Sequence, residues 1–168
     1  SWLTVEVNEL VYIWHDPDGG EPLPEQAIPV DDVVSEKGWT PWIIERVRVD
    51  VHARELIDNM ADKAHFGPVH KIARVTHFSN IAEGHKYTQL MVSQGETGKG
   101  VSEATYHGPG YMLHHMHHES ASGEITDRSM SLVMNVPTGP NSFEFIAGWK
   151  YELPEGVEDA AQIHRFCE

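Results

Sequence analysis

The fold class follows from residues 85–120, HKYTQLMVSQGETGKGVSEATYHGPGYMLHHMHHES, in which β-rich runs are separated by short turns. The runs occupy residues 85–94, 101–107 and 111–120, and the turns between them carry glycine and proline. Runs of this length and spacing are typical of neighbouring antiparallel strands. The GETGKG segment at 95–100 lies between two of these strands, so it predicts a hairpin loop rather than a phosphate-binding loop.

The same pattern extends outward from this stretch in both directions. Further strands are predicted at residues 4–7, 10–14, 42–51, 71–78, 129–136 and 143–153. HDPDGG at 15–20 is typical of a turn, and residues 21–37, with three prolines, are expected to form a connecting segment. The sequence therefore predicts an antiparallel meander.

Two segments depart from the β pattern and predict helices. HARELIDNMADKAHF at 52–66 places Leu56, Met60 and Ala64 at steps of four, which indicates an amphipathic helix ending at a Gly-Pro pair. EDAAQIHRFCE at 158–168 is expected to form a second helix. The fold class is thus α+β, and helices that close the concave face of the sheet would form a pocket for an apolar ligand.

The composition excludes several classes of function. With 12 Lys plus Arg against 26 Asp plus Glu, the formal net charge of −14 disfavours binding to nucleic acid or to anionic membranes. No apolar run is long enough to span a bilayer, and no signal peptide is recognisable at the start. The single cysteine excludes a disulfide framework and a four-thiolate metal site within the chain. We expect a cytoplasmic protein.

The 12 histidines raise the question of which of them carry chemistry. On a continuous helix Asp58, Asp62 and His65 stand at offsets of zero, four and seven, so they would share one face. His70 follows five residues later, beyond the break at 67–68, which lets the chain fold back and bring both imidazoles to one site. Two imidazoles and a carboxylate leave open coordination positions on Fe(II).

Other interpretations of the histidines stay open. The helix could be a solvated one that carries two incidental histidines, although Phe66 and Val69 would help to keep an iron site dry. HHMHHE at 114–119 is the densest histidine cluster, with His115 and His117 on one face of a strand and the others on the opposite face. A histidine that lines the substrate pocket or lies at the surface is favoured there over a separate metal site.

The segment DNMADKAHFGPVH at 58–70 resembles the mononuclear-iron motif of the Rieske non-haem iron oxygenase α subunits. It is most similar to the steroid- and sterol-directed members, such as the oxygenase component of 3-ketosteroid 9α-hydroxylase. VYIWHDPDGGEP at 11–22, EATYHGPGYM at 103–112 and SLVMNVPTGPNSFEFIAGW at 131–149 resemble other parts of this family. The resemblance covers most of the chain.

The resemblance implies a helix-grip fold in which His65 and His70 bind Fe(II). Asp62 would be the bridging carboxylate that hydrogen-bonds a cluster-ligating histidine of a neighbouring subunit, which implies a homotrimer. Asn59 would line the site. The alternatives are that Asp62 only orients His65, and that Asn59 faces solvent.

The chain also departs from the family pattern. The Cys-x-His and Cys-x-x-His pairs that hold the 2Fe–2S cluster are absent, so we expect the Rieske module to precede residue 1. The third iron ligand, a carboxylate, is expected beyond Glu168, and neither Asp159 nor Glu158 is assigned to it. Residues 1–25 would be the tail of the Rieske-side segment and a linker, and residues 26–168 a catalytic domain truncated at its C-terminal helix.

The expected function is hydroxylation of an apolar substrate, a steroid or sterol, with Fe(II) and O2. Electrons would come from a reductase or ferredoxin through the 2Fe–2S cluster, and this segment alone would be inactive because it has no electron source of its own. The alternative is a non-catalytic domain of the same fold that binds an apolar ligand without functional metal. Removal of both histidines would distinguish the two, because only the first function needs iron.

Overall fold

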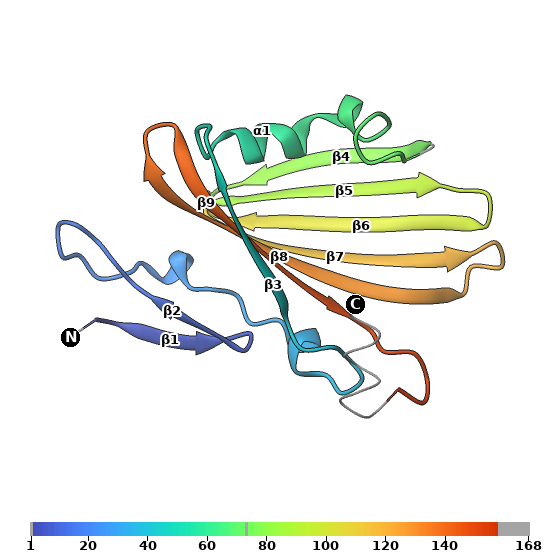
Figure 1. Cartoon of the computed structure of the whole chain (residues 1–168), viewed down its shortest axis with the longest axis horizontal. Helices are drawn as coiled ribbons and strands as arrows, with labels where there is room; N and C mark the ends of the chain where they lie inside the picture. The colour runs from blue at the N-terminus through green and yellow to red at the C-terminus, as the bar shows by residue number, and fades with distance from the viewer. Residues whose placement is uncertain (1, 73, 158–168) are drawn as a thin grey trace.

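The computed structural model describes residues 2–72 and 74–157, and its main feature is a seven-stranded antiparallel sheet in the order β3-β9-β8-β7-β6-β5-β4 (Figure 1). The strands are β3 (Ile43–Val49), β4 (Val75–Glu83), β5 (Lys86–Gln94), β6 (Gly98–His107), β7 (Tyr111–Ser120), β8 (Ile125–Gly139) and β9 (Ser142–Tyr151). From β4 to β9 each strand pairs with the next one along the chain, and β3 adds antiparallel to the outer side of β9. The predicted meander is confirmed.

The bounds of three strands differ from the prediction by three residues or more. The strand expected at 101–107 begins at Gly98, so the predicted loop at 95–100 is shorter than expected. The strand expected at 71–78 begins at Val75 and continues to Glu83. Its second half is exposed because β4 is an edge strand, so those residues lack the apolar alternation that marks a buried strand. The strand expected at 129–136 extends over 125–139, because β8 pairs along most of its length with both β7 and β9.

The N-terminal segment covers one face of the sheet. A separate hairpin pairs β1 (Thr4–Val7) with β2 (Leu10–Ile13), and its two turn residues, Asn8 and Glu9, both have positive φ, as a tight two-residue hairpin turn requires. Two 3₁₀ turns follow, η1 (Pro24–Gln26) and η2 (Asp32–Ser35). Side chains of this segment and of the approach to β3 pack on buried residues of the sheet: Leu10, Tyr12, Ile28, Val33, Val34, Trp39 and Trp42 on Tyr111, Leu113, Met130 and Leu132.

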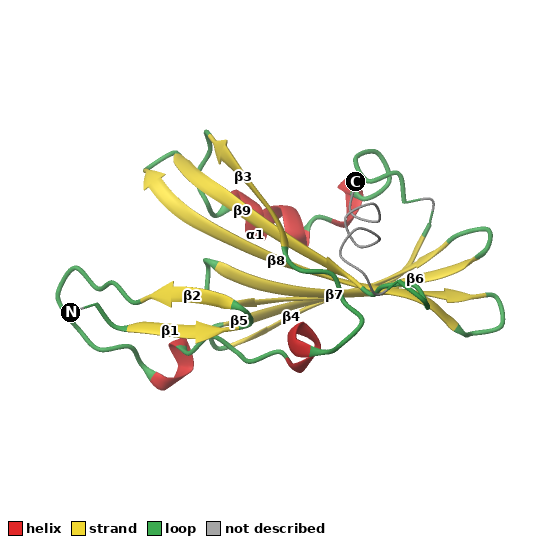
Figure 2. Ribbon diagram, turned by 60° about the horizontal axis from the view of Figure 1, so that its bottom comes forward, coloured by secondary structure: helices red, strands yellow, loops and turns green. Residues whose placement is uncertain are grey.

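The opposite face carries the helix α1 (Glu55–Ala61). Met60 of α1 is buried against Ala104, Tyr106 and Met112, and Met112 alternates along β7 with residues that face the N-terminal segment. Figure 2 shows how little of the described chain is helical. The protein is thus a largely antiparallel sheet with one α-helix in its described part, and the second predicted helix, at 158–168, lies outside the described residues together with Asp159 and Cys167.

The predicted length of the first helix is wrong. The helix expected over 52–66 ends at Ala61, because Asp62 takes an extended conformation (φ −83°, ψ 99°). The carboxylate of Asp62 accepts the Ala64 N–H at 2.8 Å and so starts the 3₁₀ turn η3 (Lys63–His65). Asp58, Asp62 and His65 therefore do not share the face of one helix. In the described residues no helix is long and apolar enough to cross a membrane.

Candidate metal and substrate site

His65 and His70 lie next to each other. Their ring centroids are 5.1 Å apart with the ring planes at 67°. The turn that follows η3 brings them together: Val69 donates its backbone N–H to the carbonyl of His65 at 2.9 Å, and the chain reverses over residues 66–70. The fold-back predicted from the Gly-Pro pair thus occurs.

A backbone contact determines the orientation of the His65 ring. Its Nδ1 is 2.6 Å from the carbonyl oxygen of Asp62. A carbonyl only accepts, so Nδ1 carries the hydrogen, and the lone pair of the neutral ring is on Nε2. Histidines that bind metals usually donate their other N–H to such a partner. His65 is therefore set up to bind a metal through Nε2.

Phe66 forms the apolar side of the histidine pair. Its ring centroid is 4.3 Å from that of His65 and 5.7 Å from that of His70, and it also packs on Phe78 at 5.8 Å. The prediction that Phe66 shields the site agrees with these contacts. The same prediction for Val69 is wrong, because Val69 is 64% exposed.

Asp62 and Asn59 both lie beside the pair, in different ways. One carboxylate oxygen of Asp62 caps η3, the other is 3.7 Å from Nδ1 of His65, and the side chain is half exposed. Asn59, on α1, lines the same cavity as His65 and His70. Asp58 instead points to the surface and pairs with Arg54 at 3.3 Å, so it lies apart from the site.

The cavity beneath α1 has a volume of about 280 Å³ and is mostly apolar. Around the two histidines and Asn59 it is lined by Leu56, Met60, Phe66, Gln89, Ala104, Tyr106, Met112, His114, Val133 and Phe145. A second cavity of about 380 Å³ adjoins it on the same face of the sheet, and the two share Phe66, His70, Gln89 and His114. Both are suited to an apolar ligand with few polar contacts.

Gln89 is the site residue that sequence reasoning missed. Its side chain is buried (3% exposed), and its Nε2 donates to the carbonyl of Met60 in the last turn of α1. This bond ties the helix to β5 and so supports the turn that carries both histidines. A signal was present in the sequence: Gln89 stands between Tyr87 and Met91 in the strand phase that faces the cavity, where a polar residue needs a partner.

Replacement of Gln89 with methionine is expected to lower the free energy of unfolding by about 1–3 kcal/mol, because it leaves the Met60 carbonyl buried without a donor. Chemical denaturation of the two proteins measures this difference. Gln94→Met is the control: Gln94 also donates to backbone carbonyls, but at an exposed hairpin that water reaches, so the loss should stay below about 0.5 kcal/mol. Equal losses in the two variants would contradict the anchoring role.

His114 is partly buried between two serines. Its Nε2 lies 2.6 Å from Oγ of Ser102 and its Nδ1 lies 3.3 Å from Oγ of Ser131. Burial and, to a smaller extent, the nearby His115 lower the pKa of His114 to about 4. A neutral imidazole, which offers one donor and one acceptor, suits two hydroxyl partners. His114 therefore presents an uncharged polar edge to both cavities.

This low pKa predicts a pH effect on stability. Between about pH 6.5 and pH 4 the unfolded chain binds a proton at His114 that the folded protein does not, so stability is full above this window and falls as the pH drops through it. The contribution is at most about 3 kcal/mol. Unfolding at several pH values should give a flatter profile for His114→Gln than for the parent protein. The exposed His118→Gln is the control, and parallel profiles for parent and His114→Gln would contradict the prediction.

The other histidines of the 114–118 cluster have separate partners. His115 contacts Asp31 at 2.7 Å on the N-terminal side of the sheet, His117 contacts Glu119 at 3.2 Å, and His118 contacts Asp127 at 2.7 Å. The predicted alternation of the cluster between two faces agrees with these partners. Among residues 2–72 and 74–157 no group of three or more His, Cys, Asp or Glu side chains is arranged to hold a metal ion.

Among the described residues the candidate ligands for iron are therefore the two imidazoles of His65 and His70. The pair fits two ligand positions, because His65 offers Nε2 and the rings adjoin a largely apolar cavity. In the described part of the chain no third His, Cys, Asp or Glu side chain completes a three-ligand group with them. His65 and His70 therefore fit two of the ligand positions of an iron site whose other coordination positions stay open.

A family model described as the 3-ketosteroid 9alpha-hydroxylase C-terminal domain matches residues 13–167. The chain belongs to this family. Its relatives include a probable 3-ketosteroid-9-alpha-monooxygenase oxygenase component from Rhodococcus rhodochrous, which is 36% identical over 97% of the chain. A 3-ketosteroid-9-alpha-monooxygenase oxygenase component from Mycolicibacterium smegmatis is 32% identical over 95% of it. The chain spans 44% of the length of each of these two relatives.

Several solved structures share the fold of this chain. Dicamba monooxygenase bound to 3,6-dichlorosalicylic acid matches 99% of the chain with a TM-score of 0.73 at 17% identity, and the match covers 54% of that protein. A quaternary ammonium Rieske monooxygenase in complex with L-carnitine matches 99% of the chain with a TM-score of 0.59 at 12% identity and covers 45% of that protein. At these identities the likeness shows a common fold.

Proposed function

We propose that this chain is the catalytic domain of a Rieske-type oxygenase component that hydroxylates a steroid or sterol with Fe(II) and O2. The observation that carries the proposal is the pair of adjacent imidazoles, His65 and His70, at the edge of an apolar cavity. Non-haem iron oxygenases bind iron through two histidines and one carboxylate and leave the other coordination positions open, and this pair would supply the two histidines. The family membership of the chain points to the same chemistry.

In this proposal His65 and His70 bind the iron, which when present activates O2 for the reaction. His65 binds through Nε2 because Nδ1 is held by the Asp62 carbonyl. Asp62 has one carboxylate oxygen outside the cap of η3, and this oxygen would contact the electron-donating group of a neighbouring subunit. Asn59 would line the substrate cavity beside the iron. The third iron ligand would be a carboxylate beyond Glu168.

The cavity favours an apolar substrate. Leu56, Met60, Tyr106, Met112, Val133 and Phe145 supply most of its surface. Phe66 and the buried residues under α1 exclude water from the side of the histidines that faces the sheet. The relatives are named for action on 3-ketosteroids, so a 3-ketosteroid is the first substrate to test.

The chain accounts for only part of the relatives' length, so the rest of the function is assigned to the whole protein. We propose a cytoplasmic homotrimer that takes electrons from a reductase or ferredoxin through a 2Fe–2S cluster in its Rieske module. Residues 1–25 would belong to the Rieske-side segment, and residues 26–168 to a catalytic domain of the helix-grip type.

The test uses the intact protein, loaded with Fe(II) without oxygen and then supplied with a 3-ketosteroid, O2 and a reductase. We expect one mononuclear iron per chain, in addition to the cluster, and a hydroxylated steroid that carries one oxygen atom from O2. Steroid binding without mononuclear iron would contradict the proposal and would favour the non-catalytic ligand-binding domain. Iron without steroid binding would contradict the substrate class alone.

A further inference from the structure

The face of the sheet that α1 covers continues well beyond the helix. Strand registry arranges its side chains in rows that cross from β5 to β8, beginning under α1 with Tyr87, Tyr106, Met112 and Val133. The next rows, in order away from α1, are Gln89, Ala104, His114 and Ser131; Met91, Ser102, Met116 and Ser129; and Ser93, Gly100, His118 and Asp127. The second cavity lies over the last three rows.

The character of this face changes along its length. The row under α1 is apolar, and the next one holds the hydrogen-bonded Gln89 and His114. Two methionines, Met91 and Met116, then line the middle of the second cavity. Ser102 and Ser129 stand in the same row as the two methionines, and the last row has no apolar side chain. The cavity therefore becomes more polar toward its far end, and the two methionines are its main apolar surface in the middle.

Gly100 leaves room at that far end. A Cβ at this position would lie 2.9 Å from Oγ of Ser93 and 3.4 Å from the ring of His118, so both side chains lean over the glycine. Nδ1 of His118 contacts a carboxylate oxygen of Asp127 at 2.7 Å and therefore carries a hydrogen. In the neutral ring Nε2 is then an acceptor, and among the described residues it has no hydrogen-bond partner.

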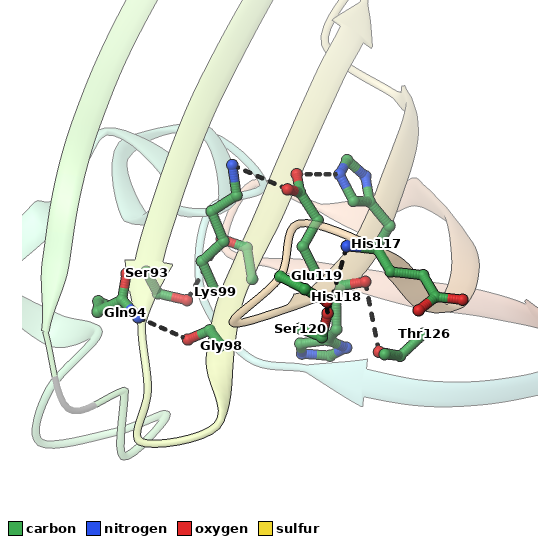
Figure 3. Close-up of polar contacts among 12 residues, drawn as sticks. Ser93, Gln94, Gly98, Lys99, His117, His118, Glu119, Ser120 and Thr126 are labelled. Carbon is green, nitrogen blue, oxygen red and sulfur yellow. Dashed lines mark hydrogen bonds and ion pairs between the residues drawn. The ribbon is translucent and has the colours of Figure 1, made fainter.

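On the opposite face of β6 and β7, which is the face toward the N-terminal segment, other side chains pair with one another. Lys99 pairs with Glu119 at 3.0 Å, and Glu119 contacts His117 at 3.2 Å (Figure 3). These groups satisfy one another, and they support the ends of β6 and β7. His118 alternates with His117 along β7, so its ring faces the cavity side, where Nε2 stays open to a ligand.

We propose that Ser93 and His118 form a distal subsite for a hydroxyl group on the substrate. A hydroxyl there would donate to Nε2 of His118 and accept from Oγ of Ser93, whose hydrogen would turn to it from a long 3.5 Å bond to the Gly100 carbonyl. The apolar body of the substrate would lie on Met91 and Met116. From the His114 row to the His118 row the strand advances by four residues, roughly 13 Å. This length suits a fused-ring skeleton better than a single aromatic ring. The inference rests on the proposed function, which it deepens.

The experiment measures steroid binding to the intact protein by titration calorimetry, without turnover. Two matched pairs of probes cover either orientation of the skeleton: testosterone with androst-4-en-3-one, and epiandrosterone with 5α-androstan-17-one. Within each pair only one hydroxyl group differs. In the parent protein the hydroxysteroid of one pair should bind about tenfold more tightly than its partner without the hydroxyl group, which is the gain expected from one well-placed hydrogen bond. This difference in affinity is called the affinity gap, or the gap for short.

His118→Phe keeps a ring over Gly100 but removes the acceptor, so this gap should close, while the steroid without the hydroxyl group should bind as before. Ser93→Ala should close the gap in part. The matched control is His85→Phe, at an exposed position in the turn between β4 and β5, which should keep the full gap. Both tested side chains lie at the end of the sheet, away from the histidine pair, so iron content should be unchanged.

The outcomes separate the inference from the function on which it rests. If the steroids bind but the hydroxyl group makes no difference, or if the gap persists in His118→Phe, the subsite is wrong and the proposed substrate class stands. If no steroid of either pair binds, both the subsite and the steroid substrate class are wrong.

Discussion

Alanine at His65 or His70 is expected to leave the intact protein without its mononuclear iron. Each variant removes one of the two imidazoles that stand 5.1 Å apart, and the remaining donors cannot hold the ion in competition with water. Affinity for Fe(II) should fall by more than about a hundredfold, since loss of outer-shell partners alone costs 10- to 100-fold. Metal analysis after anaerobic loading measures the iron, and hydroxylation should be abolished in parallel.

Two controls keep this result interpretable. His77→Ala removes an exposed histidine from β4 and should retain the full iron content. Because the His65 ring also bonds to the Asp62 carbonyl, thermal unfolding of each variant should be recorded beside the metal analysis. A folded His65→Ala or His70→Ala protein that binds as much mononuclear iron as the parent would disprove the oxygenase proposal.

Asparagine at Asp62 should separate iron binding from electron delivery. The amide oxygen can still accept the Ala64 N–H, so η3 is preserved, and the backbone carbonyl that orients His65 is unchanged. The free carboxylate oxygen is lost. Iron content and steroid affinity should therefore match the parent, while turnover with the reductase should fall about 10- to 100-fold, because electron delivery loses the carboxylate contact to the neighbouring subunit.

The matched control for Asp62 is Asp58→Asn. Asp58 lies one helical turn earlier, is exposed and pairs only with Arg54 in the described structure, so turnover should change little. Equal turnover in Asp62→Asn and the parent would show that Asp62 does no more than cap the turn. Loss of iron in Asp62→Asn would instead show that the aspartate supports the metal ligands.

The meander and the histidine pair were predictable because both depend on short-range patterns. The alternating pattern of side chains in β5, β6 and β7 can be recognised within ten residues. The Gly-Pro pair after Phe66 predicts a reversal of the chain. The distance between His65 and His70 follows from that reversal. The predicted bounds of the edge strand β4 were wrong because its exposed residues lack the apolar alternation that a buried strand shows.

The features that were missed depend on competition or on distance. At Asp62 a side-chain cap competes with one more turn of helix, and helical periodicity cannot tell which wins. Gln89 finds its partner, the Met60 carbonyl, 29 positions away, so only the folded chain shows why a buried strand carries an amide. The second cavity likewise appears only when β5, β6 and β7 are in register.

The two faces of strand β7 contact different parts of the protein. Its side chains at 112, 114, 116 and 118 form the floor of the two cavities, whereas those at 111, 113 and 115 are held by the N-terminal segment. Asn8 donates to the hydroxyl of Tyr111 at 3.0 Å, and His115 contacts Asp31 at 2.7 Å. A substitution in the N-terminal hairpin, which is far in the sequence from the proposed iron ligands, would therefore act on the reverse side of the same strand. In this way residues that do not line the cavities would still affect the positions of the side chains that do.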